Sequence, residues 1–527
     1  MKKALFLIID ALRYDVLRDE ASRRALSPNL ARLADRGFVM RATANGQATQ
    51  FVMPSLFSLT YPLDYGGYNN GIRERPKSYI ESLRDAGFET HLMAPGNQLG
   101  ITQGYERGFT TVRTTSDYRT LLQQRIERFL KYELDLWQKG ESGDARIIAF
   151  LQQEFVLLLE SLVSAIEHHD KSLWRPNLVR LNRRVADGCR AELELLRSHP
   201  RAVLDKLIRI SPGVYWRYLG RSRVGRLELF VARTVAAMNW RTRDFVGARN
   251  WFPFLPLSHR QTLTGDVTPA ICQFIDQARD RRWYIHMHVM DAHDCRAINR
   301  PFHVLGRLRY LPRWLRARLR GQTGRRFLYD SAIMYVDHHV GSLIRTLEQS
   351  DQLKDTAIFV IGDHGSQYAE SPRPKEEVGL RTHYEHIDVP LLISGVSRAP
   401  SNEGTVDTMG VSATLLDALG VPLHASHKGI SVFKSGRSAV ITESCSHGNA
   451  DLARRNIYMT VTTEFYRMMT MLENDQIVVK KLFDRRADPR ELHNLVDKAE
   501  MRGVINQLIA HLRRERASLL ELRQVAA

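Results

Sequence analysis

Two apolar stretches of the chain end in side chains that can bind a cation. Residues 357–361, AIFVI, are typical of a strand buried on both faces, and a glycine, Asp363, His364 and a second glycine follow directly. Residues 4–9 predict another buried strand, which ends at Asp10. Because ligands of open α/β sheets bind at the carboxyl ends of the strands, the Asp363–His364 pair is a candidate metal site and Asp10 offers a second oxygen ligand. The alternative is that Asp363 caps the next helix and His364 is simply exposed.

A segment with several hydroxyl groups follows a predicted strand at residues 38–43. In residues 45–58, NGQATQFVMPSLFS, Pro54 fits the first turn of a helix, where its missing N–H costs nothing. A hydroxyl beside the start of that helix would meet free backbone N–H groups, a setting that binds anions and stabilises an oxyanion. Three hydroxyl side chains are available: Thr49, Ser55 and Ser58. The alternative for each is a helix cap or a buried hydroxyl bonded to backbone. The apolar side chains expected to face the core are Phe51, Leu56 and Leu59.

The composition is that of a folded globular protein with a strong excess of positive charge. The 527 residues include 76 Lys and Arg against 58 Asp and Glu, a formal net charge of +18. This excess favours polyanionic partners, whether phosphorylated or sulfated polymers, an anionic membrane surface or nucleic acid. The four cysteines have no CxxC spacing, which favours neither a thiolate metal cluster nor a disulfide framework. Because the short apolar N-terminus predicts a strand and no stretch approaches 18 uninterrupted apolar residues, we expect a cytoplasmic protein without a membrane span.

Strand and helix patterns alternate in two parts of the chain, with a long helical stretch between them. Residues 1–114 show the βα alternation of a parallel sheet. From residue 115 to 270, Leu, Arg and Glu recur at helical spacing and strand patterns nearly vanish, which predicts a helical basic insertion. Residues 271–430 return to the α/β pattern, and residues 431–527 predict a small β-rich subdomain of antiparallel hairpins with a closing charged helix.

Several individual elements of the α/β part can be placed. Residues 27–40 are expected to form a helix that is capped by Ser27 and ended by Gly37. A long helix over residues 329–349 leads to the strand before Asp363, residues 389–393 predict another buried strand, and residues 410–420 another helix.

Residues 301–326 carry eight arginines among leucines and a tryptophan. An amphipathic basic helix of this kind can lie on an anionic membrane or cover a polyanionic substrate. The alternative is a solvated helix that packs its leucine face against the domain.

Ordered blocks of the sequence resemble the sulfatase branch of the alkaline phosphatase superfamily. LFLIIDALRYD resembles the family's first strand and metal-binding Asp, VMPSLFSLTYP the nucleophile segment, and ESLRDAGFETHLM the helix and strand that follow. YIHMHVMDAH resembles the strand that ends in a substrate-binding His, and residues 329–365 resemble the helix and strand before the second metal-binding pair. KLFDRRADPRELHNL resembles the C-terminal signature. The resemblance covers roughly half the chain, leaves the insertion unmatched, and implies an α/β fold with an alkaline-phosphatase-like, mostly parallel sheet flanked by helices.

The nucleophile segment departs from the sulfatase pattern. Sulfatases place a Cys or Ser, converted to formylglycine, two residues before the Pro of C/S-x-P-S-R, but this position is Val52 here and Leu56 replaces the Arg. Val52 cannot become formylglycine. The T-x-x-x-V-P-x-M-F-S pattern of relatives that transfer phosphoethanolamine resembles residues 49–58, which puts Thr49 in the nucleophile's place and leaves Ser55 as its main rival.

The resemblance implies one metal ion held by Asp10, Thr49, Asp363 and His364. Coordination to a divalent cation is one way to turn a Thr hydroxyl into an alkoxide near neutral pH. Three oxygens and one imidazole suit Zn²⁺ or Mn²⁺, whereas Ca²⁺ or Mg²⁺ would prefer an all-oxygen shell, and the family includes both preferences. The second Asp that sulfatases usually carry is Ala11 here, which favours a one-metal site.

Two further histidines resemble substrate-site residues of the family. His293 matches the His after the H-x-x-D-x-H strand, and His383 matches the His or Lys before the next strand, with His386 as the alternative on a shifted register. Their implied task is to bind the oxygens of the esterified anion and to protonate the leaving alkoxide.

We therefore predict a metal-dependent hydrolase or transferase that cleaves a phosphate ester through Thr49, with a covalent phospho-Thr that passes its group to water or to a second alcohol. One alternative is a sulfatase that works without formylglycine, and another is a catalytically silent protein that binds a polyanion or a membrane. The expected partner is an anionic phosphate or sulfate ester, including polysaccharide or lipid-linked esters, with peripheral contact at the inner membrane face as an option. Nucleic acid is not expected, and the oligomeric state stays open.

Overall fold

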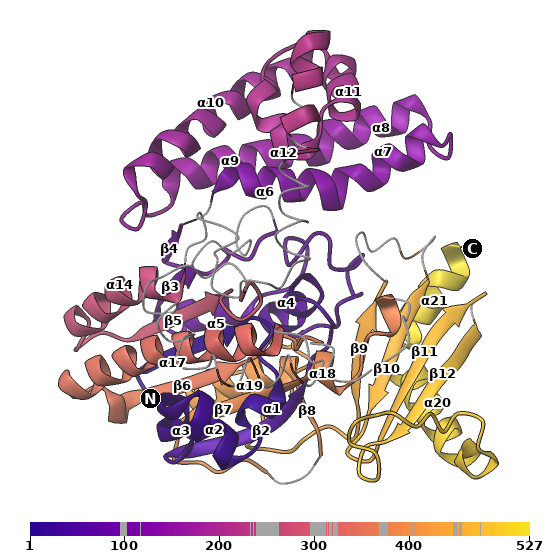
Figure 1. Ribbon diagram of the computed structural model, residues 1–527. Helices are drawn as coiled ribbons and strands as arrows, with labels where there is room; N and C mark the ends of the chain where they lie inside the picture. The colour runs from indigo at the N-terminus through magenta and orange to yellow at the C-terminus, as the bar shows by residue number, and fades with distance from the viewer. Residues whose placement is uncertain are drawn as a thin grey trace.

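The computed structural model describes residues 1–94, 103–115, 117–231, 263–295, 325–367, 378–401, 404–445, 456–474 and 476–526, with a few single positions between these ranges. The predicted arginine-rich helix at residues 301–326 lies almost entirely outside the described residues. The described chain forms an α/β domain, a helical bundle and a smaller antiparallel sheet (Figure 1).

The α/β domain is built on an eight-stranded mixed sheet. Its strands are β1 (Lys3–Ile9), β2 (Gly37–Thr43), β3 (Glu89–Ala94), β4 (Thr111–Thr114), β5 (Trp283–Val289), β6 (Thr356–Ile361), β7 (Asp388–Ser394) and β8 (Val406–Asp407). Across the sheet the order is β4-β3-β5-β1-β6-β7-β2-β8. The five strands from β4 to β6 run parallel, whereas β7 is antiparallel to both β6 and β2. The predicted mostly parallel sheet is confirmed.

Strand β1 lies at the centre of this sheet and sets the position of its neighbours. Ile8 is in register with His288 of β5 on one side and with Ile361 of β6 on the other. Every residue of β1 and β6 is buried, because both faces are covered, which explains their unbroken apolar sequences. Alternate residues enter different cores, Phe6 one and Leu7 the other. The residues that follow β1 and β6 therefore meet at the same edge of the sheet.

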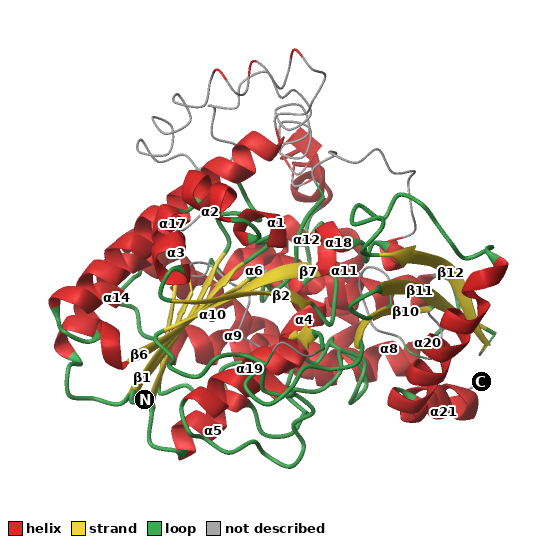
Figure 2. Cartoon of the chain, turned by 90° about the horizontal axis from the view of Figure 1, so that it is seen from below, coloured by secondary structure: helices red, strands yellow, loops and turns green. Residues whose placement is uncertain are grey.

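Helices cover both faces of the sheet (Figure 2). One face carries α3 (Pro28–Ala34), α14 (Thr264–Gln277) and α17 (Arg325–Gln349), and the other carries α4 (Thr49–Ser58), α5 (Tyr79–Asp85) and α19 (Thr408–Ala418). The shorter helices are α1 (Tyr14–Leu17), α2 (Glu20–Leu26) and α18 (Tyr384–Ile387). Helix α14 packs against α17, so the boundary predicted at residue 270 falls inside a helix of the α/β domain.

Helix α3 is capped from a distant part of the chain. The prediction that Ser27 caps this helix is wrong, because the Ser27 hydroxyl donates to a carbonyl of the preceding helix at 3.2 Å. The carboxylate of Asp337 on α17 accepts instead from the N–H groups of Asn29 (3.1 Å) and Leu30 (2.8 Å). The cap therefore also joins two helices on the same face of the sheet.

The stretch predicted as a helical insertion forms a bundle with its own hydrophobic core. It contains α6 (Tyr118–Arg125), α7 (Lys131–Gln138), α8 (Asp144–Phe150), α9 (Val156–His168), α10 (Pro176–Ser198), α11 (Pro200–Arg209) and α12 (Pro212–Tyr215), with π-helical turns η1 (Ile126–Leu130) and η2 (Leu151–Phe155). By length and composition, one helix in the described chain, Asp144–His168, could cross a membrane, with a mean hydropathy of 1.6 in its most apolar window. A third of that window is buried, where the helix contributes to the bundle core.

The C-terminal part is a four-stranded antiparallel sheet, as its alternating sequence predicts. Its strands are β9 (Val440–Ser444), β10 (Ile457–Thr462), β11 (Tyr466–Glu473) and β12 (Gln476–Asp484), followed by α20 (Arg502–Glu515) and α21 (Ala517–Ala526). Buried ion pairs join this sheet to β7. Arg467 donates to Asp388 and, at 2.6 Å, to Glu491, and Arg485 donates to Asp388 at 2.9 Å.

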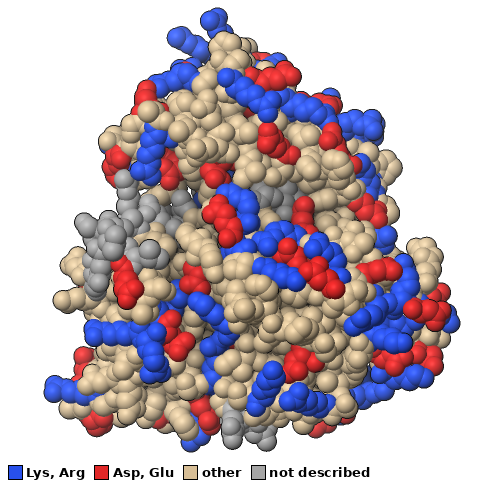
Figure 3. Space-filling view, turned by 180° about the vertical axis from the view of Figure 1, so that it is seen from behind, with Lys and Arg blue, Asp and Glu red and all other residues tan. Residues whose placement is uncertain are grey.

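Positive and negative side chains are interspersed on one face of the molecule. On the face in Figure 3, Lys and Arg side chains alternate with Asp and Glu over both the bundle and the α/β domain. This face therefore offers no single basic patch that would by itself indicate a polyanionic partner.

Candidate metal centre and nucleophile

The carboxyl ends of β1 and β6 bring Asp10, Asp363 and His364 into one cluster. His364 Nε2 lies 3.5 Å from Asp10 Oδ1 and 3.7 Å from Asp363 Oδ2. One ligand atom from each residue lies within 4.8 Å of the other two. Asp10 Oδ1 and Asp363 Oδ2 are buried and have no hydrogen-bond partner within the described chain. Buried carboxylate oxygens without donors are costly, so this cluster fits a divalent cation.

The backbone after β1 is held in an unusual turn beside the cluster. Ala11 is buried and has a φ of +62°, in the left-handed region that non-glycine residues rarely adopt. Its N–H donates to Asp363 Oδ1 at 3.1 Å, and its carbonyl accepts from the Tyr329 hydroxyl at 3.0 Å. A Cβ at Gly362 would lie 2.2 Å from the Leu12 carbonyl oxygen. The glycine beside the metal pair therefore admits a neighbouring carbonyl, and these contacts fix the ends of β1 and β6 against each other.

Thr49 is the first residue of α4 and faces this cluster. Its Oγ1 lies 2.9 Å from Asp10 Oδ2 and 3.3 Å from His364 Nε2. The side chain is half-buried. At the start of a helix it also lies beside backbone N–H groups that have no partner inside the helix. The structure thus brings together all four residues named as metal ligands.

The other two candidate hydroxyls lie further along α4 and are completely buried. Ser58 donates to the Pro54 carbonyl at 2.7 Å, which matches the structural alternative stated for it. Ser55 Oγ has no hydrogen-bond partner in the described chain. Pro54 is the sixth residue of α4 and not part of its first turn, because the helix begins earlier than predicted, at Thr49. The predicted core residues Phe51, Leu56 and Leu59 are buried.

His288 is a site residue that the sequence analysis did not assign. Its Nε2 lies 3.4 Å from Asp10 Oδ2, and the side chain is fully buried. The parallel register of β5 with β1, which pairs His288 with Ile8, places it there. His286 lies on the same face of the strand but bonds to the Tyr79 hydroxyl at 2.9 Å, away from the cluster. The sequence could have indicated it, because His288 is the first His of the H-x-x-D-x-H motif and lies close to the end of a predicted strand.

His293 follows β5 and lies at the open side of the cluster. Its side chain is 46% exposed, its Nδ1 lies 2.9 Å from Asp294 Oδ1, and its ring centroid lies 6.3 Å from that of His364. The Asp10 carboxylate raises the pKa of His293 above its usual value. Asp291, between the two outer histidines of the motif, accepts from the Thr264 hydroxyl at 2.6 Å and so caps α14.

The two candidate histidines around α18 have different surroundings. His383 is buried, with its Nδ1 3.2 Å from Glu491 Oε2 and its ring beside Phe483. The carbonyl of His386 accepts from the N–H of Gly365 at 2.7 Å, which puts this residue against the segment of the metal pair. Burial and the neighbouring His364 lower the pKa of His386 to about 3. In the described chain His383 contacts the C-terminal subdomain, whereas His386 contacts the segment that carries the metal pair.

A family model described as Sulfatase matches residues 2–421. The chain belongs to the sulfatase family. The members of this family are ester hydrolases, so this protein is a sulfatase-family enzyme. Choline-sulfatase of Rhizobium meliloti (strain 1021) is 29% identical over 188 residues. That match covers 34% of this chain and 34% of the relative, about a third of its length.

Solved structures of the superfamily share the fold of this sulfatase-family chain. The phosphonate monoester hydrolase of Agrobacterium radiobacter aligns with a TM-score of 0.55 at 14% identity, covering 98% of this chain and 96% of that one. The phosphonate monoester hydrolase of Silicibacter pomeroyi aligns with a TM-score of 0.54, the same identity and the same coverage. A 2-O GAG sulfatase aligns with a TM-score of 0.50 at 15% identity, covering 98% and 92%. At these identities the likeness shows the fold.

Proposed function

We propose that this sulfatase-family enzyme cleaves a phosphate ester by attack of Thr49 and passes the phosphoryl group to water or to a second alcohol. The observation that carries the proposal is the position of Thr49 Oγ1, 2.9 Å from Asp10 Oδ2 and 3.3 Å from His364 Nε2. Val52 occupies the position that formylglycine would take, so the hydroxyl nearest the cluster has to act in its unmodified form.

The proposed metal ligands are Asp10, Thr49, Asp363 and His364. The buried oxygens of Asp10 and Asp363 that lack hydrogen-bond partners support this assignment. Three oxygens and one imidazole favour Zn²⁺ or Mn²⁺ over Ca²⁺ or Mg²⁺. When bound, the cation would lower the pKa of the Thr49 hydroxyl and polarise the phosphate oxygens.

In the proposed reaction the proton of the Thr49 hydroxyl passes to solvent, Oγ1 forms a bond to phosphorus, and the bond between phosphorus and the leaving oxygen breaks. An imidazole at the open side of the cluster donates a proton to the leaving alkoxide. His293 is the first candidate for this role. His383, or its rival His386, is the candidate for holding the phosphate oxygens. Water or an alcohol then attacks the phosphorus of phospho-Thr49 and releases the Thr49 oxygen.

Sulfate ester hydrolysis is the second candidate function. It is favoured by the family itself and by the local match to choline-sulfatase. The same residues would act, with sulfur in place of phosphorus. A net charge of +18 supports an anionic substrate of either kind, and a cytoplasmic polysaccharide or lipid-linked ester would suit it.

Intact-mass spectrometry of acid-quenched enzyme would test the proposal. The enzyme, loaded with Zn²⁺, Mn²⁺ or Ca²⁺ in turn, is mixed with an aryl phosphate, an aryl phosphodiester or an aryl sulfate. We expect a phosphoryl adduct that maps to Thr49, is absent from Thr49→Ala and is retained by Ser55→Ala. Full turnover by Thr49→Ala would contradict the proposed nucleophile, and an adduct formed only from the sulfate would favour the second candidate.

A further inference from the structure

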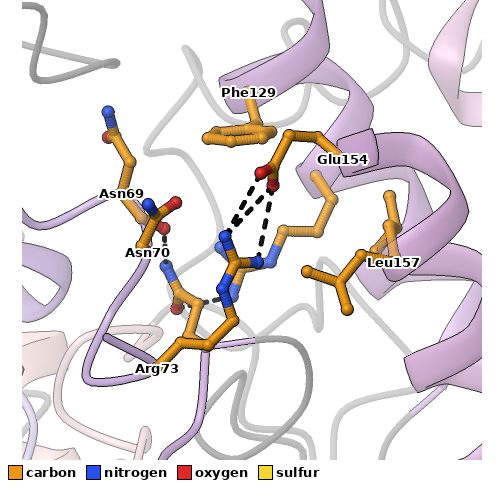
Figure 4. Close-up of a pocket in the computed structure, with 9 residues that line it drawn as sticks. Asn69, Asn70, Arg73, Phe129, Glu154 and Leu157 are labelled. Atoms are coloured by element: carbon orange, nitrogen blue, oxygen red, sulfur yellow. Dashed lines mark hydrogen bonds and ion pairs between the residues drawn. The ribbon is translucent and has the colours of Figure 1, made fainter. Parts of the chain in front are cut away.

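Outside the metal centre, a small open cavity lies between the helical bundle and the α/β domain. Its volume is about 30 Å³, and it opens between the loop around Arg73 and the helices α6, η1, η2 and α9 (Figure 4). The residues that line it are Asn69, Asn70, Arg73, Gln103, Arg125, Phe129, Glu154, Leu157 and Leu158. None of them belongs to the metal cluster.

Arg73 and Glu154 neutralise each other across this cavity. Arg73 Nη2 donates to Glu154 Oε1 at 3.2 Å, and Nη1 donates to Oε2 at 3.4 Å, the geometry drawn in Figure 4. Both side chains are about a quarter exposed. Because both carboxylate oxygens are engaged by one guanidinium, Glu154 is committed to Arg73, which also lies 3.3 Å from the exposed Glu74 carboxylate.

Arg125 makes no ion pair with a carboxylate of the described residues. Its hydrogen bond within the described chain runs from Nη2 to Gln103 Oε1 at 2.6 Å, and that acceptor is neutral. Gln103 is held in turn, since its Nε2 donates to the Asn69 carbonyl at 2.8 Å. Arg125 Nε is buried and has no hydrogen-bond partner among the residues that the structure describes. Burial lowers the pKa of Arg125 to about 10, as expected for a guanidinium that burial desolvates without a carboxylate beside it.

We propose that this cavity binds an oxyanion group, a sulfate, phosphate or carboxylate, through the guanidinium of Arg125. An oxyanion in the cavity would compensate the charge of the guanidinium that lines it. A cavity of about 30 Å³ has room on the order of two water molecules, which suits an anionic head group whose remaining part lies outside the opening. The apolar side is closed by Phe129 and Leu157, and the Asn70 side chain lies at the opposite edge (Figure 4). The proposal does not depend on the reaction proposed for Thr49.

Isothermal titration calorimetry with three probes, sodium sulfate, sodium phosphate and sodium acetate at constant ionic strength, tests this site. The parent protein carries Thr49→Ala and Asp363→Asn, so that the metal centre contributes no substrate-like anion binding. We expect one anion per chain, bound about tenfold to a hundredfold more weakly after Arg125→Gln, because a charge-assisted hydrogen bond is lost. The matched control is Arg128→Gln, an exposed Arg on the neighbouring turn, which is expected to leave the affinity unchanged.

A second variant separates the charge from the hydrogen bond. Arg125→Lys keeps the charge and removes the planar guanidinium, so we expect an affinity between those of the parent and Arg125→Gln. Thermal unfolding without anion checks that each variant is folded, and if Arg125→Gln is not, the comparison of Arg125→Lys with the parent carries the test. The proposal is overturned if none of the three anions binds the parent, or if the Arg125 variants bind as tightly as the parent does. The probe that binds most tightly identifies the class of anion that the cavity prefers.

Discussion

Two clusters of buried carboxylates in this molecule differ in where their compensating charge comes from. At the ends of β1 and β6, Asp10 and Asp363 each keep a buried oxygen without a hydrogen-bond partner in the described chain. Between β7 and the C-terminal sheet, Asp388 and Glu491 instead accept from Arg467. Around the first cluster the described cationic groups are histidines, such as His293, whose pKa Asp10 raises, and two carboxylate oxygens keep no described donor. In the second cluster an arginine donates to both carboxylates directly. The difference indicates that the first cluster is built for a cation and the second for holding two subdomains together.

The largest expected effect is on catalysis at the first cluster. Asp363→Asn removes a proposed ligand, and we expect kcat/KM for an aryl phosphate to fall by about a thousandfold, since metal stabilisation of the transition state amounts to several kcal/mol. In chelator-treated protein the same change is expected to leave the free energy of unfolding unchanged or higher, because an uncompensated carboxylate is lost. If the variant were nearly as active as the unmutated enzyme, the first cluster would not be the catalytic metal site.

At the second cluster the same kind of change should act on stability. Arg467→Met leaves Asp388 and Glu491 buried without their shared cation, so the free energy of unfolding measured in urea should fall by about 3–5 kcal/mol. The control is Arg24→Met, an exposed Arg paired with Glu20, for which a change below about 1 kcal/mol is expected. A loss no larger than that of the control would mean that the second cluster is not structural.

The pH dependence of stability offers a smaller effect of defined sign. Burial opposes the ionised form of Asp388, but Arg467 and Arg485 outweigh it and lower the pKa to about 2, below the ordinary value of 3.8. Because the folded-state pKa is the lower one, the stabilisation is present above pH 3.8 and is lost as the pH falls through about 2. We expect a loss of about 2 kcal/mol in the free energy of unfolding from this group, and a shallower slope over that window in Asp388→Asn.

The smallest effect is expected at Ser55. Its hydroxyl is buried without a hydrogen-bond partner in the described chain, so Ser55→Ala removes no described interaction. We expect kcat/KM to stay within about twofold and the free energy of unfolding to change by less than about 1 kcal/mol. Steady-state kinetics and urea unfolding measure both. A large loss of kcat with an unchanged unfolding midpoint would instead assign the nucleophile to Ser55.

The sheet was predictable because its strands are buried on both faces. Residues 357–361 lie in β6 and residues 389–393 in β7, and both show the unbroken apolar sequence that two covering layers of helices require. That Asp10 and Asp363 leave the sheet at the same edge follows from their places after parallel strands, whereas the structure shows that these two strands are neighbours. The residues at each strand end were therefore readable from local sequence, and their meeting was not.

What could not be predicted depends on contacts between distant segments. The cap of α3 comes from Asp337, about 300 residues away from the helix it caps, so nothing near Ser27 indicates it. His288 reaches Asp10 through the register between β5 and β1, and a single sequence does not give the order of strands. The surroundings of Arg125 depend on how the bundle packs against the loop that contains Arg73, which helical periodicity does not determine.

Calorimetric titration of Zn²⁺ or Mn²⁺ into the chelator-treated chain measures how many cations the protein binds. We expect one cation per chain, lost in Asp10→Asn and Asp363→Asn and retained in Glu491→Gln, whose carboxylate is also buried but already paired. Equal binding by all of these variants, or no binding by the unmutated chain, would contradict a shared cation at the ends of β1 and β6.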